Sequence, residues 1–434
     1  MTKLEEQLIS FDNIEAAVKE VSHGKRYKDE FQEFYLNLED NVINIQNELI
    51  WRSYEPLDTV SFPIREPRLR LITRPMIYDR VVHHALMRVI GPVIESHYHD
   101  CSFACRKGSE HITATAWVKG EPHSFTWTPR NKGLYTYPKA LPFNKAKDYV
   151  REETNRLFDN SAYRIDVSLH EGRGQMAAVR RYQDLLRKGL GRYGDNLYIV
   201  CIDFKHFFQS IDHETLKAII RYIFPDEDMI VWLCSKIIDA SDNERSTCPA
   251  IPMSPTDLPD AGIPIGFLPS QSFSNLVGSC VDWQLDAEGY DLVVRYADDI
   301  RILCGSQEEG ELILDRIDMY VNKLLKLHLS EKKSYVKKFK EYDTYCGYRV
   351  HPHYLECKPE TLKRAHRRLE RKKKEYAEGW ISLKQLEDTA YPLLAYRSWT
   401  DSPRDEKAEE ILNYAKSIKR TNSNSKEKEA KLEL

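Results

Sequence analysis

Apolar side chains recur at helical spacing in several stretches of this chain. In the first 50 residues, Leu4, Leu8, Phe11 and Ile14 fall on one face of a helix. Later stretches with a comparable helical pattern lie at about 78–94, 213–224, 229–238, 270–287 and 308–327. These stretches predict a chain in which helices carry much of the core.

Short apolar or alternating runs between turn residues predict strands. They are a strand pair in 59–75, the strand "LYIVCIDF" from Leu197, a strand pair around Asp298, and short strands within 342–358. Residues 241–264 are rich in proline and predict a loop. Residues 117–192 mix aromatic, glycine and proline residues with a charged helical stretch, which predicts an inserted subdomain.

The composition indicates a globular protein with a sizeable core. The chain has 434 residues, of which 41% are hydrophobic and 30% charged, enough for two or three subdomains. Crossing a bilayer needs about 20 consecutive apolar residues, and the chain has no such run. Its start is an acidic amphipathic helix, unlike a signal peptide, so we expect a cytoplasmic protein with no membrane partner.

Charge is distributed unevenly along the chain, although the formal net charge is only -3. The segment "KPETLKRAHRRLERKKK" (358–374) has nine Lys and Arg against two Glu. A basic helix of this kind fits a phosphate backbone, and it is equally typical of a solvated surface helix.

Three aspartates follow apolar strands and are the candidate chemistry of the chain. Asp298 and Asp299 interrupt "VVRYADDIRIL", and Asp203 ends "LYIVCID". Such a doublet is most often a tight turn, but a hairpin tip can also present carboxylates to a metal ion. Since no Lys or Arg on the same strands is expected to match them, the three aspartates predict a Mg²⁺ site, with two ions clamping a displacement at phosphorus. If the two motifs do not meet in space, the aspartates are a helix cap and a turn.

The motifs "IDFKHFFQSID", "GIPIGFLPSQSFSNL" and "RYADDI", in this order, resemble the palm motifs of reverse transcriptases. The resemblance extends to the fingers segment "RLRLITRPMIYDRVVHHAL" and the thumb segment "LKRAHRRLERKKK". It implies an α+β right-hand polymerase fold. The expected divisions are an N-terminal helical extension (1–55), fingers (56–116), an insertion atypical of the family (117–192), palm (193–355), helical thumb (356–415) and a polar flexible tail (416–434).

The resemblance also implies roles for individual residues. The catalytic, metal-binding set is Asp203, Asp298 and Asp299, with the Phe204 carbonyl as a further ligand of two Mg²⁺ ions. The nucleotide-binding set is Arg70, Arg68, Phe208 as the steric gate against a 2′-hydroxyl, Ile265, Gly266, Gln271, and Lys333 or its neighbour Lys332. The primer and template set is Tyr296, Arg364, Arg367, Arg368 and Arg371.

One departure from the family points to a lineage. Ile265 and Gln271 stand where most members have Gln and Pro, which is similar to diversity-generating retroelement enzymes and related bacterial lineages. Losing the Gln amide puts strict base selection in doubt. The insertion points instead to stand-alone reverse transcriptases of antiphage defence, which copy an associated noncoding RNA.

The expected function is therefore RNA-directed DNA synthesis from a noncoding RNA template and dNTPs, giving a DNA product, in antiphage defence. The alternatives are error-prone copying of a template repeat, and template-independent or protein-primed DNA synthesis. Aromatic and basic residues of the insertion are expected to hold the RNA, or to be simple structural elements: Trp117, Trp127, Tyr135, Tyr137, Arg180 and Arg181.

Overall fold

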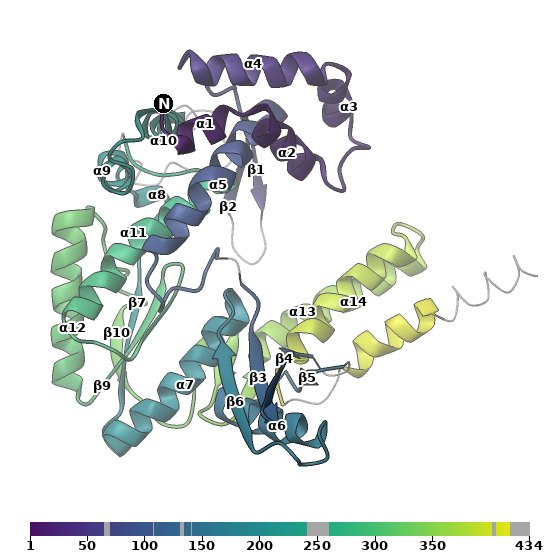
Figure 1. Ribbon diagram of the computed structural model, residues 1–434, viewed down its shortest axis with the longest axis vertical. Helices are drawn as coiled ribbons and strands as arrows, with labels where there is room; N and C mark the ends of the chain where they lie inside the picture. Colours follow the sequence, from purple (N-terminus) through teal and green to yellow (C-terminus); the bar gives the residue numbers. More distant parts are fainter. Residues whose placement is uncertain are drawn as a thin grey trace, which may run out of the picture. The chain divides into compact units, whose positions relative to one another are not determined.

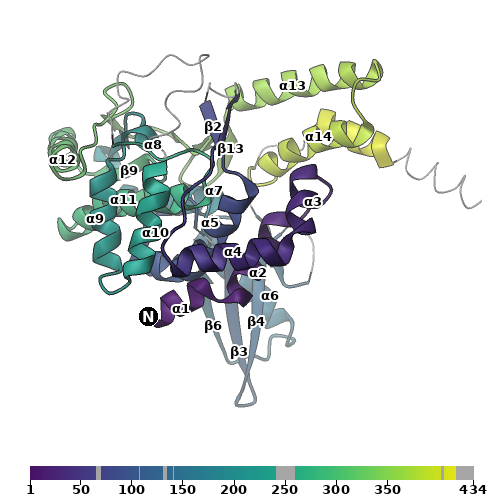
Figure 2. The ribbon, with the colours of Figure 1, turned by 90° about the horizontal axis from the view of Figure 1, so that it is seen from above.

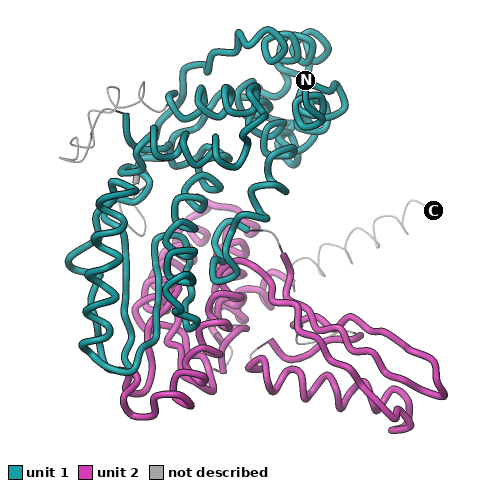
Figure 3. The backbone as a smooth tube through the Cα atoms, turned by 60° about the vertical axis from the view of Figure 1, so that its left-hand side comes forward, with its two compact units in different colours: residues 1–106, 198–338 teal, residues 107–197, 339–434 magenta. Residues whose placement is uncertain are grey.

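The computed structural model describes residues 1–64, 70–106, 108–130, 134–139, 141–240, 260–401 and 405–416 (Figure 1). Helices and mostly antiparallel strands alternate in this part of the chain, which confirms the α+β class. The chain forms two compact units, each built from two separate segments (Figure 3). Unit 1 comprises residues 1–106 and 198–338, and unit 2 comprises residues 107–197 and 339–434. No helix in the described part is both long enough and apolar enough to cross a bilayer.

The N-terminal helices of unit 1 surround the long helix α5 (Ile77–His97), as Figures 1 and 2 show. They are α1 (Lys3–Ile9), α2 (Phe11–Ser22), α3 (Asp29–Leu36) and α4 (Leu38–Ile50). Thr2 and Ser10 cap α1 and α2 with their hydroxyl groups, which satisfies backbone N–H groups that the helix itself leaves free. Leu8 and Ile14 are fully buried, as the helical spacing predicts, whereas Phe11, expected on the same face, is exposed because the helix is interrupted at Ser10.

The central sheet of unit 1 has the strand order β10-β7-β9-β8, and every pair is antiparallel. Its strands are β7 (Tyr198–Asp203), β8 (Val293–Tyr296), β9 (Asp299–Cys304) and β10 (Tyr335–Lys338). A second, two-stranded sheet joins β1 (Val60–Ile64) to β2 (Arg70–Arg74). An antiparallel sheet packed with helices is the arrangement that the resemblance implies for the palm.

A further set of helices contacts α5, the sheet or one another. They are α8 (Phe207–Ser210), α9 (His213–Ile223), α10 (Asp228–Asp239), α11 (Leu268–Ala287) and α12 (Gln307–Tyr320), which continues as a π-helical turn (Val321–Leu325). Asp212 caps α9 by accepting a hydrogen bond from the Thr215 N–H. The sequence predicts one helix over about 308–327. In the structure the α-helical part of this segment, α12, ends at Tyr320 and the π-helical turn follows.

Unit 2 contains two sheets and a helical end. One sheet has the order β5-β4-β3-β6, with β3 (His111–Val118), β4 (Glu121–Pro129), β5 (Thr136–Tyr137) and β6 (Arg164–His170). The other joins β11 (Asp343–Tyr345), β12 (Tyr348–Val350) and β13 (Leu355–Cys357). The helices are α6 (Phe143–Arg156), α7 (Gln175–Tyr193), a 3₁₀ turn (Gly194–Asn196), α13 (Pro359–Ala377), α14 (Leu383–Arg397) and the helical residues 406–416. The insertion boundary expected at 117 falls inside β3, so this sheet begins earlier than the sequence suggests.

Several residues expected to hold RNA from this insertion instead form its core. Arg180 is 2% exposed and forms an ion pair of 3.1 Å with Glu110, which is also buried. Tyr137 is buried as well and donates a hydrogen bond to Glu110, and Trp127 is buried. A buried aromatic ring cannot stack on a base without unfolding its surroundings, so the prediction is wrong for these three residues. Trp117, Tyr135 and Arg181 are half-buried.

Candidate active site

The aspartate doublet lies at a tight hairpin between β8 and β9. Tyr296 pairs with Asp299, so the turn itself consists of Ala297 and Asp298. Ala297 has φ 56°, a left-handed conformation that costs energy for a residue with a Cβ atom. The turn interpretation is correct, and the same turn places the half-buried Asp298 at the tip while Asp299 begins a buried strand.

Asp203 lies directly opposite Asp299, because β7 and β9 pair in that register. Opposite residues of antiparallel strands project from the same face, with Cβ atoms about 5 Å apart. Burial, with a smaller contribution from the charges of Asp203 and Asp298, raises the pKa of Asp299 to about 6 against the lowering effect of Arg301. The two motifs therefore meet in space, which excludes the interpretation as an unrelated cap and turn.

Two basic side chains neutralise part of this negative charge, contrary to the expectation of unmatched carboxylates. The Lys333 ammonium lies 2.6 and 2.7 Å from the two carboxylate oxygens of Asp203. Arg301, on the same strand as Asp299, forms an ion pair with it. Since β9 itself contributes Arg301, the absence of a matching cation cannot be the argument for a metal.

The donor chemistry still fits a hard divalent cation. Asp203, Asp298 and Asp299 offer only oxygen ligands, and a carboxyl whose pKa is raised by burial and by acidic neighbours gains from additional positive charge. In the described residues no three acidic, His or Cys side chains are gathered closely enough to hold a metal ion. Binding of Mg²⁺ by these aspartates remains a prediction, and it requires Lys333 and Arg301 to release the oxygens that they contact.

Hydroxyl and backbone groups of the segment just before β10 contact the end of β7 and fix its position. The Ser334 hydroxyl lies 3.2 Å from both the N–H and the carbonyl oxygen of Asp203, and the Ser330 N–H donates to the same carbonyl. Phe204 is buried and pairs with Leu329. The position of Asp203 is thus defined by the backbone, whereas the role of the Phe204 carbonyl as a metal ligand is untested.

The two aromatic residues of α8 have different surroundings. Phe207 is buried and stacks on Phe204 at 5.0 Å between ring centroids. Phe208 is partly exposed and packs against the edge of the core, while its carbonyl oxygen accepts a hydrogen bond from the Ile263 N–H. A partly exposed ring is compatible with a steric gate, and this role stays a prediction.

Ile265 and Gly266 lie against β2, which belongs to the expected fingers. The Ile265 carbonyl oxygen accepts a hydrogen bond of 2.9 Å from the Thr73 N–H. Gly266 has φ 134°, and a Cβ atom there would stand 2.1 Å from the Thr73 carbonyl oxygen, so only glycine fits. Gln271 is exposed at the start of α11. The close approach that requires glycine at this point is to the backbone of β2, and the expected contact of Gly266 with a substrate stays a prediction.

Of the remaining predicted residues, some lie in the described part of the chain and some outside it. Arg68 lies outside the described residues, and so does the side chain of Arg70, whose backbone begins β2. Tyr296 is half-buried beside the hairpin. The four arginines expected to contact primer or template are exposed on α13, in unit 2: Arg364, Arg367, Arg368 and Arg371. They lie on a solvated face, where both a nucleic-acid contact and the plain surface interpretation remain open.

Arg295 is a residue that sequence reasoning missed. It is fully buried, and its guanidinium makes a bidentate pair with Asp282 at 2.7 to 2.9 Å. It also donates to Asn275 and to the carbonyl oxygen of Ala297 at the hairpin turn. Gly278 makes room for it, since a Cβ atom there would lie 2.4 Å from the guanidinium. Its position inside the apolar strand motif "VVRYADDIRIL" was a signal in the sequence that this arginine is buried and paired.

Comparisons with known proteins give distant similarities. No family model matches the chain, and no curated protein matches it. Among solved structures, apo telomerase from Candida tropicalis aligns at 12% identity over 70% of this chain and 48% of its own, with a TM-score of 0.40. A partial Cas6-RT-Cas1–Cas2 complex aligns at 17% identity over 74% of this chain and 43% of its own, with a TM-score of 0.33. Telomerase from Candida albicans in complex with a telomeric RNA fragment aligns at 11% identity over 86% and 70%, with a TM-score of 0.36. The chain thus spans less than half the length of the first two.

Proposed function

We propose that this chain is an RNA-directed DNA polymerase. The observation that carries the proposal is the register of β7 and β9, which sets Asp203 against Asp299 beside a hairpin tip that presents Asp298. Carboxylates on rigid strands are what nucleotidyl transfer requires, since that chemistry depends on positioning and on electrostatic stabilisation.

In this proposal the three aspartates would hold Mg²⁺. Two bound ions would neutralise the triphosphate and favour ionisation of the attacking 3′-hydroxyl. The protein's own contribution is to hold Asp203 and Asp299 on adjacent strands and to keep the hairpin tip in place through Arg295. Phe208 would exclude the 2′-hydroxyl of a ribonucleotide, and Lys333 would stay near the departing pyrophosphate.

We further infer that the template is a noncoding RNA and that the setting is antiphage defence. This part depends on the resemblance of the palm motifs and on the presence of an additional sheet and helices in 107–197. An error-prone, diversity-generating copier is the second candidate, because Ile265 lacks the amide that most of the family presents at this position.

The direct test is DNA synthesis by the full-length chain on a primed RNA template with dNTPs and Mg²⁺. We expect Asp298→Asn with Asp299→Asn to abolish synthesis and to leave folding intact. The matched control is Asp315→Asn, which removes an exposed carboxylate from α12. Synthesis by the double variant at the rate of the unaltered chain would refute the proposal. Sequencing RNA that co-purifies with the protein, and measuring the error rate of the product, separates the two candidate settings.

A further inference from the structure

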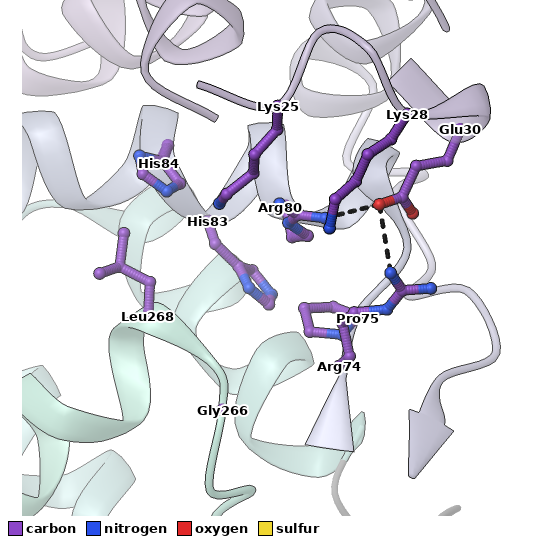
Figure 4. Close-up of a pocket in the computed structure, with 10 residues that line it drawn as sticks. All are labelled: Lys25, Lys28, Glu30, Arg74, Pro75, Arg80, His83, His84, Gly266 and Leu268. Atoms are coloured by element: carbon purple, nitrogen blue, oxygen red, sulfur yellow. Dashed lines mark hydrogen bonds and ion pairs between the residues drawn. The ribbon is translucent and has the colours of Figure 1, made fainter. Parts of the chain in front are cut away.

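A basic pocket lies between the N-terminal helices and the expected fingers of unit 1. Its volume is about 350 Å³, and it is lined by residues of the turn between α2 and α3, of β2 and of α5. Figure 4 shows Lys25 and Lys28 descending from that turn towards Arg80 and His83 of α5. None of the aspartates of the candidate active site lines this pocket.

Positive charge in the pocket exceeds negative charge. Four cationic side chains, Lys25, Lys28, Arg74 and Arg80, share a single lining carboxylate, Glu30. Arg74 and Arg80 both direct a guanidinium nitrogen to the same Glu30 oxygen, at 3.1 and 3.6 Å. Among the described residues, the ammonium groups of Lys25 and Lys28 form no ion pair. One carboxylate therefore cannot balance the pocket.

Mutual repulsion of these cations is visible in their acid–base properties. Burial lowers the pKa of Lys25, and the charges of Arg80 and Lys28 lower it further. Burial also lowers the pKa of Arg80, which Glu30 raises and Arg74 lowers. A group that brought negative charge into the pocket would relieve this repulsion, because close like charges are costly where solvent is partly excluded.

The buried end of the pocket carries a polar group without a partner. His83 is 1% exposed, and its Nδ1 has no hydrogen-bond partner in the described part of the chain. Burial lowers its pKa to about 3, so the imidazole is neutral at physiological pH and offers one N–H donor. A nitrogen without a partner at the buried end of the pocket is available to a bound group.

We propose that this pocket binds a compact phosphate group with several negative charges, of the kind found in the terminal polyphosphate of a nucleotide or of an RNA 5′ end. A recess with an excess of cations suits charge concentrated on one terminal group. A phosphodiester backbone, by contrast, carries one charge per nucleotide and needs an extended groove. The inference rests in part on the proposed polymerase function, since Gly266 of the expected nucleotide-binding set also lines the pocket, whereas the three aspartates do not.

The test is calorimetric titration of the full-length chain with inorganic triphosphate in the presence of EDTA. Lys25→Ala with Lys28→Ala should weaken binding roughly tenfold or more, because two charge-assisted contacts are lost. Both lysines are exposed, so the fold should survive their removal. The matched control is Lys3→Ala with Lys19→Ala, which removes the same charge from exposed positions of α1 and α2. Absence of triphosphate binding, or equal affinities in both double variants, would overturn the proposal.

Two further ligands separate the sources of the phosphate. A dNTP and a short RNA with a 5′-triphosphate are titrated into the same variants, and whichever depends on Lys25 and Lys28 identifies the natural group. If Lys25→Ala with Lys28→Ala weakened binding of the same RNA with a 5′-hydroxyl by the same factor, the pocket would bind the backbone and the inference would be wrong. Repeating the triphosphate titration with the Asp298→Asn and Asp299→Asn variant, which should bind normally, keeps this result independent of polymerase activity.

Discussion

The Arg295 guanidinium donates a hydrogen bond of 3.1 Å to the Ala297 carbonyl oxygen, joining strand β8 to the first residue of its own turn. The same guanidinium is held by Asp282 in a pair that is wholly removed from solvent. A buried ion pair with complete hydrogen bonding is costly to break, because the remaining partner becomes an uncompensated charge. The tip that carries Asp298 therefore depends on a network centred on α11.

We predict that Arg295→Met destabilises the chain by about 3 to 5 kcal/mol, since it leaves Asp282 buried and unpaired. Urea unfolding measures this change. Arg295→Met combined with Asp282→Leu should recover much of the stability, because no charge then remains buried. In DNA synthesis the double variant should have a lower kcat than the unaltered chain and a similar KM, because the Ala297 carbonyl oxygen loses its hydrogen-bond donor. A double variant with normal kcat would exclude a positioning role.

Asp299 should make stability depend on pH. Its pKa is 3.8 in an unfolded chain and about 6 in the folded one, so the folded state holds the proton more tightly. The contribution of this carboxyl to stability is fully present below about pH 3.8 and is lost as pH rises through about 6. Asp299→Asn should therefore match the unaltered chain at low pH and be more stable at pH 8. If the variant and the unaltered chain had equal unfolding free energies at pH 8 as well as at low pH, the burial of this group would be contradicted.

Lys333 should compete with magnesium for Asp203. Its ammonium contacts both carboxylate oxygens, so Lys333→Ala frees a ligand. We expect the Mg²⁺ concentration for half-maximal DNA synthesis to fall roughly two- to fivefold, given that the ion pair is partly exposed. The maximal rate should fall as well if the ammonium assists departure of pyrophosphate. Lys332→Ala removes the neighbouring exposed lysine and should leave the Mg²⁺ dependence unchanged.

Phe208 should select the sugar of the incoming nucleotide. Its ring is partly exposed at the start of α8, whereas that of Phe207 is buried. Phe208→Ala should raise incorporation of ribonucleotides relative to deoxyribonucleotides by about tenfold or more, because the steric barrier to the 2′-hydroxyl is removed. Phe208→Tyr keeps the ring and should keep the selectivity. The ratio of kcat/KM for the two nucleotide types is the measurement, and an unaltered ratio in the alanine variant would assign Phe208 to packing alone.

The helices and strands of unit 1 could be predicted from periodicity. In α2, α5 and α9, for example, the buried apolar residues recur at helical spacing within the helix's own sequence. The proximity of Asp203 to Asp298 and Asp299 could be predicted only from the resemblance of the three motifs, in their order, to those of reverse transcriptases. The distance between the aspartates along the sequence does not show which strands pair. The pairing of Arg301 with Asp299, and of Arg180 with Glu110, could not be predicted. A charged residue in the sequence does not reveal whether its side chain faces solvent or a buried partner. For this reason the expectation of carboxylates without a matching cation was wrong, and so was the RNA-binding role of Arg180.

Unit 2 is assembled from two segments separated by much of unit 1, and side chains from one segment close on the other. Tyr182 of α7 donates to Asp343, and Gln183 donates to the carbonyl oxygen of His351. During synthesis on the ribosome, α7 emerges long before these partners, so its contacts with them form only after the C-terminal segment has been made. Truncation after β10 would leave the buried side chains of Tyr182 and Gln183 facing solvent, so we expect the middle of the chain to need the C-terminal segment in order to fold.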